Sequence, residues 1–170
     1  KQIKIKYDFL LSNIETKYKG SELWINQILN LEKKASKLSK FDFHEKNYQK
    51  LVKNAIQTLK NNDSIFLGNS MLIRMFDKFS EKTDKNIRIY GNHITRGIDG
   101  LISTSLGCAF SNTKGKNYLF IGDVSFFYDL NGFHILKHEK INLNIIVANN
   151  NGGQIFSTLP YADKGIKEFE

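Results

Sequence analysis

Short uninterrupted apolar runs recur along the second half of the chain, and most are followed by an amphipathic stretch. The clearest runs are residues 118–121 (YLFI) and 145–148 (IIVA). A strand with one solvated face would alternate apolar and polar residues, so runs without alternation indicate strands that are covered on both faces. Strands that alternate with helices in this way are typical of a parallel sheet. We therefore expect an α/β fold, a doubly wound parallel sheet with helices on both faces.

The apolar runs predict four strands, and the amphipathic stretches predict the helices that connect them. We expect strands at residues 64–67, 87–90, 118–121 and 143–148, and helices at residues 70–79, 98–111 and within 125–138. A fifth unit would begin beyond the last residue. An amphipathic stretch before the first strand, at residues 41–61, predicts one further helix, and residues 20–40 have a looser helical pattern.

The ends of the chain indicate a piece of a larger protein. The sequence has no initial methionine and stops directly after a motif-rich region. We expect residues 1–40 to be the end of a preceding central domain or a linker. Residues 41–170 are expected to form a domain that is incomplete at its C-terminus.

Composition favours a globular protein of a reducing compartment. Apolar residues make up 41% of the 170 residues, which is enough to build a core. The sequence has one proline and no composition typical of disordered segments. No apolar run approaches the ~20 residues that a membrane span needs. The one cysteine, Cys108, lies in an apolar run and is expected to be a buried, inert thiol. We expect a cytoplasmic protein without a membrane span.

The net charge of +8 raises the question of a nucleic-acid partner. Residues 1–60 hold 13 lysines and 6 acidic residues, whereas residues 61–170, which hold the motifs, are nearly balanced. Four lysines have a spacing that favours the solvated face of a helix over a phosphate-binding stripe: Lys33, Lys34, Lys37 and Lys40. The basic segment has no interleaved aromatic residues in a recognisable binding pattern. We therefore expect no nucleic-acid partner.

Polar residues follow two of the predicted strands, at the edge where an open parallel sheet binds its ligands. Asp123 follows the third strand, and Asn150 and Gly152 follow the fourth. They offer a carboxylate, an amide oxygen and a backbone carbonyl, which are hard oxygen ligands suited to octahedral Mg²⁺. A helix that begins near Ser125 would direct its N-terminal amides at the same crevice and favour a phosphate there. These residues predict one site for a metal and a phosphate group.

Each of the two motifs has a simpler explanation when it is taken alone. Residues 122–123 (GD) after a strand form a common turn, and residues 149–153 (NNNGG) form a common loop. However, Asp123 and Asn150 lie 27 residues apart, with one predicted helix and one predicted strand between them. This spacing brings both to the same edge of the sheet, so the pair favours a functional site.

The paired motifs resemble the signature of the thiamin-diphosphate-dependent enzymes, GDG followed by NN, with Val124 in place of the last glycine. Longer stretches narrow the resemblance to the MenD family, the 2-succinyl-5-enolpyruvyl-6-hydroxy-3-cyclohexene-1-carboxylate synthases of menaquinone biosynthesis. The resemblance is dense over residues 60–160, weak over residues 1–60, and implies the diphosphate-binding domain of the thiamin-diphosphate-binding fold. The matching stretches are residues 67–70 (LGNS) with Arg74, 97–104 (GIDGLIST), 122–131 (GDVSFFYDLN) and 149–160 (NNNGGQIFSTLP).

The resemblance implies a role for each matching residue. Asp123, Asn150 and Gly152 would be ligands of Mg²⁺ or Mn²⁺, and Ile98 would hold thiamin diphosphate in its bent shape. The other cofactor-binding residues would be Gly122, Ser125, Asn150, Ile155, Phe156 and Leu159. The last three of these are equally compatible with plain core positions.

The resemblance places the substrates beside Ser70 and Arg74. Arg74 comes one turn after Ser70, where binding a substrate carboxylate is favoured over an ordinary helix-surface position. The family has an arginine directly after an asparagine in the loop before GIDG, whereas this chain has His93 there and Arg96 three residues later. Either residue could supply the cation. A histidine does so weakly at neutral pH, because its reference pKa is about 6.5.

The resemblance also implies a reaction and partners. The enzyme would be a transferase of the carboligase type that decarboxylates 2-oxoglutarate and adds the succinyl unit to isochorismate, giving 2-succinyl-5-enolpyruvyl-6-hydroxy-3-cyclohexene-1-carboxylate. It would be a homodimer or tetramer with its site at a subunit interface. The glutamate that activates the aminopyrimidine would come from the N-terminal domain of a partner subunit. This piece alone is therefore expected to be inactive.

Two other functions are compatible with the diphosphate motif. One is another thiamin-diphosphate-dependent 2-oxo-acid decarboxylase or an acetolactate-synthase-like enzyme, against which the NNNGGQIF and YDLN stretches speak. The other is a decayed homologue that retains only the fold. Activity with 2-oxoglutarate and isochorismate distinguishes the expected synthase from the first alternative. Binding of thiamin diphosphate and Mg²⁺ distinguishes it from the second.

Overall fold

The structure is a computed structural model that describes residues 21–38, 43–92 and 96–158. The chain divides into two compact units, residues 1–41 and residues 42–170. The described part of the first unit is a single helix, α2 (Glu22–Leu38). Several of its large apolar side chains, among them Leu23 and Trp24, are exposed.

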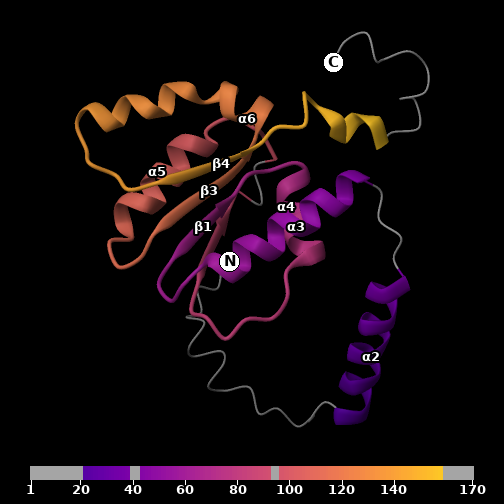
Figure 1. Ribbon diagram of the computed structural model, residues 1–170. Coiled ribbons are helices and arrows are strands. Elements are labelled where there is room, and N and C mark those ends of the chain that lie inside the picture. The colour runs from indigo at the N-terminus through magenta and orange to yellow at the C-terminus, as the bar shows by residue number, and fades with distance from the viewer. Residues whose placement is uncertain (1–20, 39–42, 93–95, 159–170) are drawn as a thin grey trace, which may run out of the picture. The chain divides into compact units, whose positions relative to one another are not determined.

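A four-stranded parallel sheet forms the centre of the second unit (Figure 1). The strands stand in the order β2-β1-β3-β4, and the register pairs Leu67 with Phe120 and Gly122 with Ala148. Because every pair is parallel, all four strands end at the same edge of the sheet. The expected parallel α/β fold is confirmed. The strands are β1 (Ser64–Leu67), β2 (Arg88–Gly91), β3 (Asn117–Gly122) and β4 (Asn144–Ala148).

Helices cover both faces of this sheet, as the side chains of β3 demonstrate. The Phe120 ring packs edge-on against Phe76, with 4.9 Å between ring centroids, on the face covered by α4 (Met71–Phe79) and by α3 (Phe43–Thr58), which packs against α4. The neighbouring side chains Leu119 and Ile121 point to the opposite face and share a core with α5 (Leu101–Ser111). The alternation along one strand explains why residues 118–121 are apolar without interruption.

The segment after β3 forms two short helices where one was expected. Helix α6 (Asp123–Tyr128) ends before Asp129, and a 3₁₀ helix, η1 (Leu130–Lys137), follows. The Asp129 carboxylate accepts hydrogen bonds from the Ser103 backbone N–H at 2.7 Å and from the Ser103 hydroxyl at 3.1 Å. Asp129 thereby satisfies an N–H of the first turn of α5 that has no partner within its own helix. The single helix that the amphipathic pattern predicts is interrupted at Asp129, whose φ of −127° and ψ of 28° lie outside the helical region.

Other elements lie close to their predicted bounds. Helix α5 begins at Leu101, three residues later than expected, because Gly100 has φ of 67°, outside the helical region. The loop after β4 ends in a short 3₁₀ helix, η2 (Gln154–Thr158).

Two expectations from composition concern membrane spans and the single cysteine. Among the helices of the described ranges, none is both long and apolar enough to cross a membrane. Cys108 is half-buried in α5, and this burial raises the pKa of its thiol. A raised pKa lowers the thiolate fraction and hence the reactivity of the side chain.

Leu119→Ala is expected to destabilise the sheet strongly. Leu119 is fully buried at the centre of β3, and truncation of such a leucine costs about 2–5 kcal/mol of the free energy of unfolding. Urea denaturation measures the loss. The matched control is Leu136→Ala, because Leu136 is 43% exposed. Equal losses in the two variants would contradict the assignment of β3 as the core strand.

Candidate functional site

A cavity lies at the edge of the sheet where the strands end. It is bordered by the segments that follow all four strands and by one side chain of α3. This is the edge where the sequence predicts a metal and phosphate site. The cavity is lined by Tyr48, Asn69, Ser70, Met71, Leu72, Ile98, Gly122, Asp123, Val124, Ser125, Ala148, Asn150, Gly152, Gly153, Gln154, Ile155 and Phe156.

Most of the predicted site residues meet in this cavity, although they come from four separate stretches of the sequence. Arg74 and Arg96 are exposed and do not line it. His93 and Leu159 lie outside the described residues. The predicted residues that line the cavity are Ser70, Ile98, Gly122, Asp123, Ser125, Asn150, Gly152, Ile155 and Phe156.

Asp123 connects the loops that follow β3 and β4. It is the first residue of α6 and stands directly after the last residue of β3. One carboxylate oxygen accepts a hydrogen bond from the Gly152 N–H at 3.0 Å, and the other accepts one from the Val124 N–H at 2.9 Å. Each oxygen keeps a further lone pair. The carboxylate is thus held beside the β4 loop while it can still coordinate a cation.

Asn150 has one buried oxygen that its surroundings leave unused. Its Oδ1 is buried and accepts no hydrogen bond from the described residues. Its Nδ2 donates to the Tyr48 hydroxyl at 3.5 Å, and its backbone carbonyl accepts a hydrogen bond from Gln154 Nε2 at 2.6 Å. A buried acceptor without a partner costs about 1–3 kcal/mol. Because Asn150 lines the cavity, this atom indicates a position where a ligand would restore the lost interaction.

The backbone of the β4 loop curls sharply between Asn150 and Gln154. Asn151 has φ of 63° and Gly152 has φ of 115°. Gly152 can adopt this conformation at low cost because it lacks a Cβ atom. Its carbonyl accepts a hydrogen bond from the Gln154 N–H at 2.8 Å, and a carbonyl oxygen has a second lone pair for another partner.

These donors fit a hard divalent cation. A carboxylate, an amide oxygen and a backbone carbonyl match the oxygen ligands of Mg²⁺, which keeps further positions for water and phosphate oxygens. In the part of the chain that the structure describes, no three His, Cys, Asp or Glu side chains cluster as a metal site. The fit therefore depends on Asn150 Oδ1 and the Gly152 carbonyl beside the single carboxylate of Asp123.

The segment after β1 is strained and is held by neighbouring polar groups. Ser70 has φ of 75° and ψ of −131°, a conformation that residues with a Cβ atom rarely adopt. Arg74 donates from Nη1 to the Ser70 carbonyl at 2.7 Å, and buried Asn69 donates to the Gly97 carbonyl at 2.6 Å. Asn69 thereby ties this segment to the loop before α5. Strain of this kind collects at functional sites.

Tyr48 is a site residue that the sequence did not reveal. Its helical spacing indicates only the apolar face of α3, yet its hydroxyl reaches Asn150, 102 residues away in sequence. Burial raises the pKa of the Tyr48 hydroxyl and the negative charge of Asp123 raises it further, while the hydrogen bond with Asn150 acts in the opposite direction. Tyr48 is therefore a neutral phenol at neutral pH.

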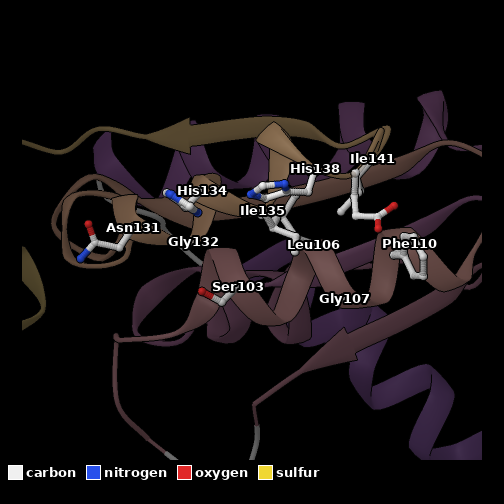
Figure 2. A pocket seen from close by; sticks show the side chains of 11 residues that line it. Ser103, Leu106, Gly107, Phe110, Asn131, Gly132, His134, Ile135, His138 and Ile141 are labelled. Carbon is white, nitrogen blue, oxygen red and sulfur yellow. The ribbon is translucent and has the colours of Figure 1, made fainter.

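A second and larger cavity lies between α5 and η1 (Figure 2). Its volume is 600 Å³, against 130 Å³ at the sheet edge. Figure 2 shows His134 of η1 and His138, the residue directly after η1, beside the cavity that Leu106 of α5 also lines, and the two imidazole centroids are 5.9 Å apart. The lining is mostly apolar and holds none of the predicted ligands. Donor chemistry, rather than volume, selects the sheet-edge cavity as the candidate site.

Several known proteins are similar in sequence to this chain. No protein-family model matches it. The 2-succinyl-5-enolpyruvyl-6-hydroxy-3-cyclohexene-1-carboxylate synthase of Staphylococcus epidermidis is 38% identical over 165 residues, which are 96% of this chain and 29% of that protein. The synthase of the same name from Enterococcus faecalis is 37% identical over 149 residues, 86% of this chain and 26% of that protein.

A relative from Bacillus velezensis with the same name is 50% identical over 99 residues, which are 58% of this chain and 17% of that protein. The chain thus spans less than a third of the length of the curated relatives that it matches. Within this span it is homologous to part of the 2-succinyl-5-enolpyruvyl-6-hydroxy-3-cyclohexene-1-carboxylate synthases, the MenD family.

Proposed function

We propose that these residues belong to a thiamin-diphosphate- and Mg²⁺-dependent transferase of menaquinone biosynthesis. Its substrates are 2-oxoglutarate, which is decarboxylated, and isochorismate, which receives the succinyl unit. The product is 2-succinyl-5-enolpyruvyl-6-hydroxy-3-cyclohexene-1-carboxylate. The observation that carries the proposal is that Asn150, whose buried Oδ1 has no partner among the described residues, lines the same cavity as Asp123 and Gly152. The name that these relatives share supports the reaction.

The proposed roles follow from the position of each side chain. Asp123, Asn150 and the Gly152 carbonyl hold Mg²⁺ or Mn²⁺. When bound, thiamin diphosphate supplies the carbanion chemistry of decarboxylation and transfer. The residues proposed to contact the cofactor are Ile98, Gly122, Ser125, Asn150, Ile155, Phe156 and Leu159.

Substrate binding is assigned to the segment after β1. Both substrates are polyanions, so the pocket needs cations and hydrogen-bond donors. Ser70 lines the cavity, and Arg74 is fixed to the Ser70 carbonyl through one N–H while its exposed guanidinium keeps other donors. His93 or Arg96 supplies a further cation. The half-buried side chains of Ile98 and Ile155 add apolar surface to the cavity lining.

The proposed enzyme needs more than this chain. Residues 41–170 are assigned to the diphosphate- and metal-binding domain, and residues 1–40 to the end of the preceding domain or a linker. A homodimer or tetramer would complete the site at a subunit interface with the activating glutamate of a partner subunit. The limited share of the relatives' length that the chain spans agrees with this division. The chain alone is expected to be inactive.

Asp123→Ala in the full-length protein is expected to abolish Mg²⁺-dependent binding of thiamin diphosphate. The expected loss is at least roughly 100-fold, because even the groups around metal ligands contribute 10- to 100-fold to metal affinity. Isothermal titration with the cofactor, with and without Mg²⁺, measures it. Asp77→Ala is the control, because Asp77 is an exposed residue of α4 that does not line the cavity. Wild-type protein that binds no cofactor would favour a decayed homologue, and unchanged binding by Asp123→Ala would refute the ligand assignment.

Substrate specificity distinguishes the proposed synthase from other thiamin-diphosphate-dependent enzymes. The full-length protein is expected to form product from 2-oxoglutarate with isochorismate and none from pyruvate alone. Chromatography of the reaction mixtures with mass detection measures both. A product from pyruvate alone would favour a decarboxylase or an acetolactate-synthase-like enzyme instead.

A further inference from the structure

Tyr48 contacts Asn150 of the candidate metal site, although Tyr48 lies outside the sequence motifs that predicted this site. It lies in α3, within the same compact unit as the sheet. Its half-buried side chain lines the sheet-edge cavity together with Asn150, and both residues also line an adjoining cavity bounded by Asn47 and Leu51. Tyr48 and Asn150 therefore form part of the wall between the two cavities.

The contacts of Asn150 divide between the two ends of its amide. Nδ2 donates to the Tyr48 hydroxyl at 3.5 Å, and Oδ1 is buried without a partner in the described residues. The carboxamide is planar, so a partner at the nitrogen also determines where the oxygen points. The backbone of Asn150 is held separately by Gln154 Nε2 at 2.6 Å. Tyr48 thus restrains the side chain, and Gln154 restrains the backbone.

We propose that Tyr48 is a positioning residue of the metal site. Its hydroxyl accepts a hydrogen bond from Asn150 Nδ2 and thereby holds Oδ1 of the same amide toward the cavity, ready to coordinate the cation. This role rests on the proposed function, in which Asn150 is a metal ligand. A phenyl ring in place of Tyr48 would keep the packing but leave the Asn150 N–H without its acceptor.

The test compares Mn²⁺ binding by full-length variants in the presence of thiamin diphosphate, with the free ion measured by electron paramagnetic resonance. Tyr48→Phe is expected to weaken Mn²⁺ binding roughly tenfold, the lower end of the effect of removing a partner of a metal ligand. The control is Tyr118→Phe, because Tyr118 stands near the start of β3, at the opposite edge of the sheet. It should bind Mn²⁺ like the wild type. Both variants should unfold cooperatively without metal, and Tyr48→Phe should show at most the small drop in Tm that the loss of one hydrogen bond causes.

A double-mutant cycle distinguishes positioning from a general structural role. If Tyr48 acts through Asn150, Tyr48→Phe weakens Mn²⁺ binding no further in an Asn150→Ala background. Equal Mn²⁺ affinity of wild type and Tyr48→Phe would overturn the positioning role and leave the proposed function intact. An equal loss in both backgrounds, or the loss of cooperative metal-free unfolding in Tyr48→Phe, would also overturn it. Failure of the wild type to bind Mn²⁺ with thiamin diphosphate would overturn both proposals.

Discussion

The parallel pairing of β3 with β4 is the constraint on which the candidate site depends. The register of this pair places Gly122 opposite Ala148, so the segments that follow β3 and β4 leave the sheet at the same level. Asp123 then follows one residue after β3, and Asn150 two residues after β4. The hydrogen bond from the Gly152 N–H to the Asp123 carboxylate joins the two loops directly. A shift of one residue in this register would turn every side chain of the displaced strand to the other face and separate the ligands.

The buried sheet gives a rigid support to loops that are locally unfavourable. Ser70 and Asn151 have positive φ values, and Asn150 Oδ1 is buried without a partner in the described part of the chain. Each such feature costs on the order of 1–3 kcal/mol, which is a large share of the stability of a typical domain. The fully buried side chains of Ile65, Leu119 and Ile121 supply the apolar burial that offsets this cost. A ligand that coordinates Asn150 Oδ1 would recover part of it.

Local patterns predicted the fold and most of the cavity, whereas contacts between distant segments escaped prediction. Uninterrupted apolar runs indicate a doubly covered sheet because both faces of β3 are buried, and polar residues after β3 and β4 indicate ligands because parallel strands end at one edge. The role of Tyr48 depends on how α3 lies relative to a loop 102 residues away. The break after Tyr128 falls at Asp129, whose carboxylate contacts Ser103, 26 residues earlier in the sequence. Neither contact leaves a periodic signal in the sequence.

In the proposed function, Asp123, Asn150 and Gly152 bind one divalent cation at the edge of the sheet. The most direct measurement is anomalous scattering from crystals of the full-length protein grown with thiamin diphosphate and Mn²⁺. The predicted result is one anomalous peak per site, coordinated by the Asp123 carboxylate, Asn150 Oδ1 and the Gly152 carbonyl. Bound cofactor with its metal on other protein ligands, or crystals that show neither cofactor nor metal at this edge, would contradict the account.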